Sequence, residues 1–377
     1  MAVALEELYR EIEPKFYVRL RTKSCFHKII EWTHIVEDFE FIELLHGNEL
    51  IFNTGINYHS DEWLMEYITL LNNAGAGGLV IALHNGVKMP QEIIDYCDQI
   101  KFPLFEAAWE TPYMIIMRLF AEILLKNEQR ETNLITAFRN AISHPDNPAL
   151  YQDVLEKEGF GKNGTYTIIV LSCNSYWDGQ ENWKLKEIEQ KLHYARRQYA
   201  VYEEKGRLVI LAAGQKMDFL RHKFGMLCEE DPNVYVGIGT KIRQLKDIHR
   251  SYESAMTAYR LTRTAIASNI LFYDELGVYK VISNLKRPET GDEFVTEVLG
   301  NLMAYDRKNN TDYMSILQAF FENECSVIHT AQAIYCHKNT LTYKINKIRE
   351  LLNCDIMSNE NRTRIMLALY FIKMRKQ

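Results

Sequence analysis

Apolar residues near the end of the chain recur at helical spacing in two short segments. Val327, Ala331 and Ile334 are separated by four and three residues, so they share one face of a first helix. Ser326 precedes this helix, where its hydroxyl would accept a free backbone N–H. A second stripe lies on one face of the next helix and consists of Leu341, Ile345, Ile348 and Leu352. The pattern predicts two helices around a corner at residues 335–338, which is a helix-turn-helix.

Polar and cationic side chains are predicted to lie opposite the apolar stripe of the second helix. A turn of about 100° per residue directs Asn339, Tyr343 and Asn346 outward. Amide, hydroxyl and cationic groups near the start of such a helix read base edges in the major groove, and its free N–H groups suit a phosphate. The residues that we predict to contact DNA are His337, Lys338, Asn339, Thr340, Thr342, Tyr343, Asn346 and Lys347.

The distribution of charge favours DNA over protein as the partner of this segment. Residues 324–377 contain nine Lys or Arg and four Asp or Glu, a net charge of +5, whereas the whole chain has −6. The other 323 residues therefore carry −11. A separate positive end is what phosphate neutralisation requires. Double-stranded DNA is thus the predicted partner, and a protein-docking module remains the alternative.

Residues 29–112 alternate between short extended and helical segments. We predict extended segments at residues 49–53, 78–83 and 103–106, and helices at residues 61–73 and 90–100. Such alternation with short turns is typical of an α/β domain, which we place at residues 1–112. Gly75, Gly77 and Gly78 follow a predicted helix, so we interpret them as a helix cap and turn instead of a phosphate-binding loop.

Residues 113–158 are predicted to be a helical linker, with a long helix to about residue 143. Its apolar positions are interrupted by the polar residues 127–132 and consist of Ile116, Leu119, Ile123, Leu134, Phe138 and Ile142. This stripe either pairs with its copy in a second subunit or packs on the chain's own domains. Pairing would make the protein a homodimer or a higher homo-oligomer, and the sequence leaves both alternatives open.

Residues 159–285 have an α+β pattern. The predicted order is a strand at 165–173, a helix at 181–198, a hairpin at 199–203 and 207–212, a strand at 233–238 and a helix at 245–263. This order resembles the ferredoxin-like palm of nucleotide cyclases that carry the Gly-Gly-Asp-Glu-Phe motif. The resemblance implies an alternative function, that of a nucleotide-binding protein or a weak diguanylate cyclase-like enzyme.

The residues that a cyclase palm needs are not where its chemistry requires them. Two-metal phosphoryl transfer needs carboxylates at the exit of the first strand and on the hairpin, with a glycine pair that leaves room for the triphosphate. Here the strand exits through Ser-Cys-Asn at residues 172–174, and the hairpin has two acids but no glycine pair. Lys205 and Arg207 would compete for any acidic partner. We therefore interpret this domain as a degenerate spacer or dimerisation module, and we predict no enzyme, catalytic residue, cofactor or metal.

Composition indicates a folded protein outside the membrane. The 377 residues suggest two or three domains, and 47% hydrophobic and 25% charged residues are ordinary for such a protein. No apolar run approaches the roughly 18 residues of a membrane helix, and the start lacks the pattern of a secretory signal. Seven cysteines without a Cys-x-x-Cys pair favour a reducing compartment, so we expect a cytoplasmic protein.

The C-terminal segment resembles the DNA-binding domain of PucR-type transcriptional regulators, which are named for the control of purine catabolism. The matching residues are Thr330-Ala331, His337 to Leu341, Tyr343 to Ile345, Lys347 to Leu352, Asp355, Arg362 and Leu367 to Leu369. The resemblance implies an all-α helix-turn-helix domain, which we place at residues 295–377. The family usually has Arg-Tyr-Arg where residues 342–344 are Thr-Tyr-Lys. Because Arg and Lys differ at a base edge, we expect a different operator sequence.

Residues 31–34, 45–55 and 74–81 resemble the N-terminal domain of the same regulators, with Asn48 in place of a family glycine. That domain is thought to sense a small molecule, so the resemblance implies an effector, which the family name suggests to be purine-related. The candidates for contacting it are Glu49, Thr54 and Gly55. The alternative is that Glu49 is a buried ion-pair partner and Thr54-Gly55 a plain turn.

These features predict a ligand-responsive transcriptional regulator that binds specific DNA sequences. In this hypothesis an effector bound near residues 49–55 changes the arrangement of the helical linkers in a dimer. The separation of the two recognition helices, and hence their fit to two half-sites, would change with it.

Overall fold

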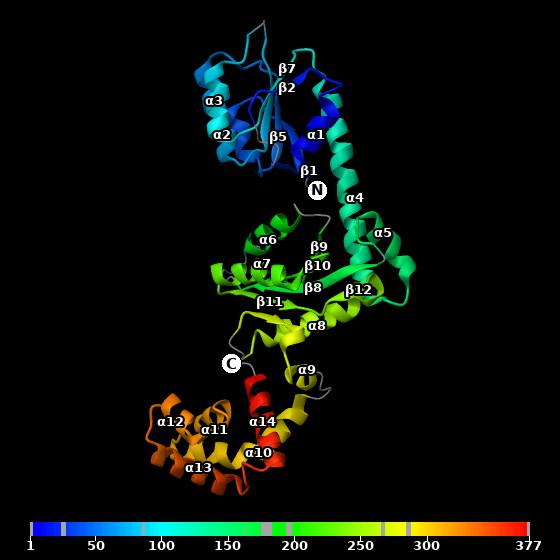
Figure 1. Cartoon of the computed structure of the whole chain (residues 1–377). Helices are drawn as coiled ribbons and strands as arrows, with labels where there is room; N and C mark the ends of the chain where they lie inside the picture. Colours follow the sequence, from blue (N-terminus) through cyan, green and yellow to red (C-terminus); the bar gives the residue numbers. More distant parts are fainter. Residues whose placement is uncertain are drawn as a thin grey trace. The chain divides into compact units, whose positions relative to one another are not determined.

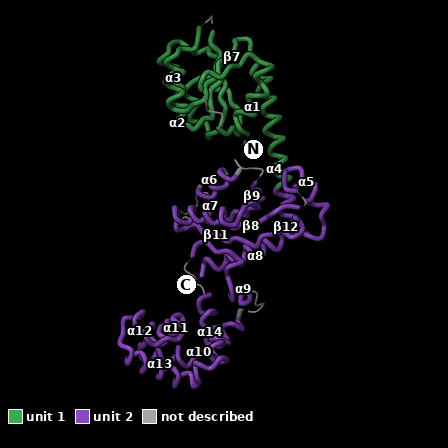
Figure 2. The backbone as a smooth tube through the Cα atoms, in the orientation of Figure 1, with its two compact units in different colours: residues 1–134 green, residues 135–377 purple. Residues whose placement is uncertain are grey.

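The computed structural model describes residues 3–23, 28–84, 87–161, 163–174, 183–193, 198–264, 268–283 and 288–374. The chain divides into two compact units, residues 1–134 and 135–377 (Figure 2). One long helix, α4 (Tyr113–Ser143), belongs to both units. Within the described ranges, no helix is long and apolar enough to cross a membrane.

The first unit is built on a mostly parallel sheet with the strand order β2-β7-β6-β5-β4. Strands β4 to β7 are parallel to their neighbours, and β2 is antiparallel to β7. The strands of this unit are β1 (Val3–Ala4), β2 (Val18–Leu20), β3 (Ile29–Ile30), β4 (Trp32–Ile35), β5 (Glu49–Asn53), β6 (Gly78–Ala82) and β7 (Leu104–Ala107). Its other helices are α1 (Leu5–Ile12), η1 (Phe39–Leu44), α2 (Asp61–Asn73) and α3 (Gln91–Gln99).

Both faces of this sheet are covered, because alternate residues of a strand point to opposite sides. Ile51 of β5 packs in one core with residues of α2 and α3, whereas Leu50 and Phe52 pack in the other core with α1 and α4. Figure 1 shows α2 and α3 on one side of the sheet and α1 on the other. A strand buried on both faces is apolar at successive positions, which explains the run Leu50-Ile51-Phe52 within β5 and the wholly apolar sequence of β6.

The predicted elements of this unit are present, and the α/β assignment is confirmed. Strand β5 and helix α2 have the predicted bounds, β6 differs from them by one residue at its end, and α3 and β7 differ by one residue at both ends. The hydroxyl of Ser60 accepts the N–H of Trp63 at 3.2 Å and begins α2. Gly75 has φ +77° directly after α2, as expected for the residue that ends a helix.

The second unit begins with the end of α4 and contains an α+β region. Its described strands form a sheet with the order β13-β11-β8-β10-β9, and β12 also pairs with β8. The strands are β8 (Asn163–Cys173), β9 (Tyr199–Glu204), β10 (Arg207–Ala213), β11 (Val234–Ile238), β12 (Ile242–Gln244) and β13 (Ile270–Phe272). The helices are η2 (Pro148–Leu150), α5 (Gln152–Lys157), α6 (Trp183–His193), α7 (Met217–Glu230), η3 (Leu245–Asp247), α8 (Ile248–Leu261), η4 (Tyr273–Glu275) and α9 (Tyr279–Ile282).

Helices cover both faces of this second sheet. The core between the sheet and helices α6 and α7 includes Leu171, Leu185 and Phe224. Helix α8 lies on the opposite face (Figure 1). The mixed character and the strand order along the chain agree with the prediction. The predicted helix start at Glu181, the residues 194–197 near its predicted end and the predicted domain end at residue 285 lie outside the described residues.

Helix α4 is continuous through the polar residues 127–132, so the predicted interruption is not a break in the helix. Ile116 and Phe120 are fully buried in the first unit, and Phe138 is fully buried in the second. These three side chains pack within the chain itself, which favours the alternative of a linker packed on its own domains. Pairing of α4 between two subunits remains a prediction.

Candidate nucleic-acid interface

The described residues from 288 to 374 form five helices, which make up the C-terminal part of the second unit (Figure 1). They are α10 (Pro288–Asn309), α11 (Tyr313–Glu322), α12 (Val327–Ala333), α13 (Lys338–Leu352) and α14 (Asn359–Met374). All five contribute to one apolar core, whose most buried residues include Leu299, Leu302, Leu317, Leu341, Ile348, Ile356 and Ala368. This core fixes the positions of α12 and α13, the predicted helix-turn-helix pair.

Helix α12 begins and ends with hydrogen bonds that its sequence supplies. The hydroxyl of Ser326 accepts the N–H of His329 at 3.3 Å, so the predicted cap is confirmed. At the other end, the N–H of Cys336 donates to the carbonyl of Ala331 and the N–H of Tyr335 to that of Gln332. Tyr335 has φ +51°, the left-handed conformation that reverses the chain after a helix. The corner therefore falls at residues 334–337, one residue earlier than predicted.

Helix α13 is held against the core by the predicted apolar stripe. Leu341, Ile345 and Ile348 are at most 4% exposed, and Leu352 is partly buried. The helix begins at His337, whose Nδ1 lies 3.2 Å from the backbone nitrogen of Asn339 and accepts its N–H. It ends at Asn353, which has φ +48°.

The opposite face of α13 presents the predicted DNA-contacting residues to solvent. Seven of the eight are exposed, and the eighth, Lys347, is partly exposed. Asn339, Tyr343 and Asn346 share one outward face, and the ring of Tyr343 is 68% exposed. The hydroxyl of Thr342 donates to the carbonyl of Lys338 at 2.9 Å, so part of its hydrogen-bonding capacity is used within the helix. The structure thus brings these residues together on one continuous surface.

Several cations of this domain are engaged in ion pairs. Lys344 pairs with Asp312, and Lys347 with Glu350, whose carboxylate raises the pKa of Lys347. Arg364 and Lys373 pair with Glu297 and Glu322 and connect α14 to α10 and α11. Among the described residues after 324, the cations without a carboxylate partner are Lys338, Arg349 and Arg362. The number of cations available to contact phosphate is therefore smaller than the nine Lys and Arg residues of the segment suggest.

The three candidates for effector contact lie at the two ends of strand β5. Glu49 begins β5, whereas Thr54 and Gly55 follow its end, and five residues of strand separate them by about 16 Å. The residue Glu49 is 7% exposed. Its Oε1 accepts the N–H of His46 at 2.8 Å, and its buried Oε2 has no hydrogen-bond partner. Glu49 thus lies at one end of β5 and Thr54-Gly55 at the other, and effector contact at any of the three residues stays a prediction.

The turn after β5 is closely packed. The amide N–H of Thr54 lies 3.1 Å from both carboxylate oxygens of Glu37, and the N–H of Gly55 donates to the side chain of Asn53 at 2.7 Å. Gly55 has φ +73°, and a Cβ at this position would lie 1.8 Å from the carbonyl oxygen of Ala82. The hydroxyl oxygen of Thr54 is buried without a partner. Gly55 is thus required by packing, whereas Thr54 retains an unused polar atom.

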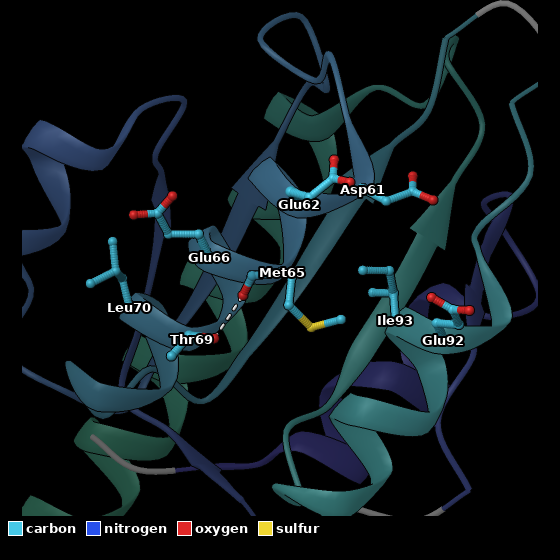
Figure 3. Close-up of a pocket in the computed structure, with 8 residues that line it drawn as sticks. All are labelled: Asp61, Glu62, Met65, Glu66, Thr69, Leu70, Glu92 and Ile93. Carbon is cyan, nitrogen blue, oxygen red and sulfur yellow. Dashed lines mark hydrogen bonds between the residues drawn. The ribbon is translucent and has the colours of Figure 1, made fainter.

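A groove between α2 and α3 has a volume of about 600 Å³. Its lining consists of Asp61, Glu62, Met65, Glu66, Thr69, Leu70, Glu92 and Ile93 (Figure 3). None of the three sequence candidates belongs to it. Four carboxylates surround an apolar floor, so an anionic ligand would be disfavoured there. The groove was not predicted, because no local sequence pattern links residues of two separate helices.

The middle domain has basic groups near the strand exit where a cyclase palm would hold metal. Strand β8 ends at Cys173, and Arg263 donates to the side-chain oxygen of the next residue, Asn174, at 3.2 Å. The guanidinium of Arg207 lies 5.9 Å from the centre of the Tyr259 ring. Within the described ranges there is no group of three His, Cys, Asp or Glu residues suited to a metal ion.

Comparison with known families accounts for three successive parts of the chain. Residues 15–124 match the purine catabolism regulatory protein-like family, residues 152–261 a GGDEF-like domain, and residues 313–371 the PucR C-terminal helix-turn-helix domain. The chain belongs to the PucR-type family. The third match contains α12, α13 and all eight predicted DNA-contacting residues.

Curated relatives of this PucR-type chain include regulators with different names. The proline-responsive transcriptional activator PutR of Bacillus subtilis is 28% identical over 146 residues, 38% of this chain and 35% of the relative. The carbohydrate diacid regulator of Escherichia coli is 27% identical over 36% of this chain and 34% of the relative. The purine catabolism regulatory protein of Bacillus subtilis is 30% identical over 18% of this chain and 13% of the relative. The chain thus matches about a third or less of each relative's length.

A solved structure, the regulator of polyketide synthase expression from Bifidobacterium adolescentis, is also similar. It is 15% identical and covers 64% of this chain and 97% of its own, with a TM-score of 0.31. That score is too low to define a common arrangement of the domains.

Proposed function

We propose that this protein is a transcriptional regulator that binds specific DNA sequences and acts in the cytoplasm. The observation that carries the proposal is the outward face of α13, where Asn339, Tyr343 and Asn346 are exposed together at the start and middle of a helix. Such a helix enters the major groove and reads base edges through its side chains. The helix-turn-helix match of residues 313–371 supports the same interpretation.

We propose that a small effector binds the first unit. Glu49 and Thr54 each have a buried side-chain oxygen without a partner, and Glu49 has the stronger support because an unpaired carboxylate oxygen costs more than an unpaired hydroxyl. Such an atom costs free energy unless a ligand or neighbour donates a hydrogen bond to it. An effector with an N–H or O–H donor would meet this need. The relatives carry the names of proline, carbohydrate diacid and purine regulation, so the family leaves the effector class open.

We propose that the middle domain is a non-catalytic spacer or dimerisation module. The chain order β8-α6-β9-β10-α7-β11 with the sheet order β11-β8-β10-β9 supports a ferredoxin-like palm. Arg263 at the strand exit argues against two-metal chemistry there, because its positive charge would repel a divalent cation.

In the proposed mechanism of regulation, an effector changes the arrangement of two subunits. The spacing of the two recognition helices on DNA changes as a result.

Selection of bound fragments from genomic DNA by the full chain, at two salt concentrations with and without candidate effectors, tests the proposal. We expect a few discrete sites containing repeats, with an affinity that falls steeply as salt rises. Absence of enrichment under every condition would favour the protein-docking alternative. In that alternative the affinity for the partner protein would depend little on salt, because the docking contact is apolar.

A further inference from the structure

The corner between α12 and α13 holds the most exposed large hydrophobic side chain among the described residues. Tyr335 is 97% exposed, against 68% for Tyr343 on the neighbouring helix. Within the described residues, its hydroxyl has no hydrogen-bond partner. Packing and hydrogen bonding within the chain therefore contribute almost nothing to the placement of this ring.

The backbone at Tyr335 is in a conformation that disfavours a tyrosine. Its φ of +51° lies in the left-handed region, at the position after a helix where glycine is usual. The two hydrogen bonds that close this helix end, from the N–H groups of Tyr335 and Cys336, involve backbone atoms only. Glycine would form the same turn without the steric cost of a side chain. Bulky residues in such strained backbone conformations occur preferentially at functional sites, so the conformation of Tyr335 motivates a functional hypothesis.

The position of the corner identifies the class of partner. Tyr335 lies two residues before His337, which caps the start of the recognition helix. Lys338, the first residue of that helix, is exposed and has no carboxylate partner among the described residues. When the start of α13 enters a major groove, the preceding corner meets the rim of the groove, where phosphates lie. Tyrosine hydroxyls are among the groups that donate to DNA phosphates.

We propose that the hydroxyl of Tyr335 donates a hydrogen bond to a backbone phosphate at the edge of the groove. This inference rests on the proposed DNA binding and adds a contact outside the recognition helix. A phosphate contact fixes the position of a protein on the duplex but carries no base information. Tyr335 therefore contributes to affinity on every DNA sequence and leaves the preference for the operator unchanged.

The test compares the full chain with Tyr335→Phe and Tyr335→Gly on an operator fragment and on an unrelated fragment of equal length. Loss of one hydrogen bond from a neutral donor to a charged phosphate predicts a roughly ten- to hundredfold weaker affinity of Tyr335→Phe on both fragments. The ratio of the two affinities should not change. The slope of log affinity against log salt should also stay the same, because a neutral donor releases no counterion. Tyr335→Gly should bind at least as weakly while its melting temperature is unchanged or higher.

Tyr17→Phe is the matched control, because Tyr17 is 78% exposed and lies in the other unit. It should bind both fragments as the wild type does. Wild-type affinity of Tyr335→Phe would overturn the inference while leaving the proposed function intact. Normal DNA affinity combined with lost regulation in Tyr335→Gly would also overturn it, in favour of a protein partner. A wild-type chain that binds no DNA under any effector condition would overturn the proposed function as well.

Discussion

Lys344 of the recognition helix forms an ion pair with Asp312 at the start of α11, with 3.1 Å between Nζ and Oδ1. Its side chain is 29% exposed and faces the helical bundle. This residue occupies a position where relatives usually have arginine, and it was expected to bear on the operator sequence. Its contact with Asp312 connects α13 to α11 of the same domain, and an effect of this residue on the operator sequence stays a prediction.

We therefore expect Lys344→Ala to lower the free energy of unfolding by about 0.2–1 kcal/mol, as for other partly exposed ion pairs. The salt dependence of DNA affinity should stay the same, because a paired cation releases few counterions. Urea denaturation and binding titrations at several salt concentrations measure both quantities. Asp312→Asn should cause a similar loss of stability, and a salt slope reduced by about one in Lys344→Ala would place the lysine on a phosphate instead.

Gly55 is predicted to be intolerant of any side chain. A Cβ there would lie 1.8 Å from the carbonyl oxygen of Ala82, and φ is +73°. Gly55→Ala should cost more than about 2 kcal/mol through strain and displacement of β6. Gly47→Ala is the control in the same unit, since φ is +93° but the nearest atoms are at an ordinary 3.7 Å. Thermal unfolding should rank Gly55→Ala well below Gly47→Ala, and equal losses would mean that the close approach to Ala82 is unimportant.

Cys173 is predicted to be unreactive in the folded protein. Burial, together with the Asp231 carboxylate 3.6 Å from Sγ, raises the pKa of its thiol to about 11. An unfolded cysteine ionises at about 8.5, so the folded state disfavours the thiolate. The associated stability is complete below about pH 8.5 and is lost as the pH rises through the folded pKa.

Two measurements check this prediction. Iodoacetamide at pH 8.5 should modify Cys173 slowly until the protein unfolds, as followed by peptide mass spectrometry. When the pH is raised from 8 to 10, the free energy of unfolding from urea denaturation should fall less in Cys173→Ser than in the wild type. Rapid modification of Cys173 in the native protein would show that the thiol is neither buried nor near a carboxylate.

Local patterns in the sequence predicted the central strands of both sheets and the helix-turn-helix pair. The bounds of α2 were predictable because Ser60 supplies a cap and Gly75 a helix end on either side of a regular apolar pattern. The outward face of α13 followed from periodicity alone, since that depends on residues three or four positions apart.

Contacts between distant residues were not predictable in this way. Lys344 and Asp312 are 32 residues apart, and no local pattern links them. Glu49 and Thr54 were grouped because they are close in sequence. The extended strand β5 nevertheless places them far apart, because Glu49 begins it and Thr54 follows its end. The left-handed conformation of Tyr335 was also not predicted, because the residue that ends a helix in this conformation is usually glycine.

The central claim is that the outward face of α13 reads base edges. The most direct test is equilibrium binding of the full chain to a mapped operator, comparing the wild type with Asn339→Ala and Tyr343→Ala. Asn133→Ala, an exposed asparagine of helix α4, serves as the control. Each recognition-helix variant should lose about 1–3 kcal/mol of operator binding per base contact and retain its affinity for unrelated DNA. Wild-type operator affinity in both variants would contradict the account.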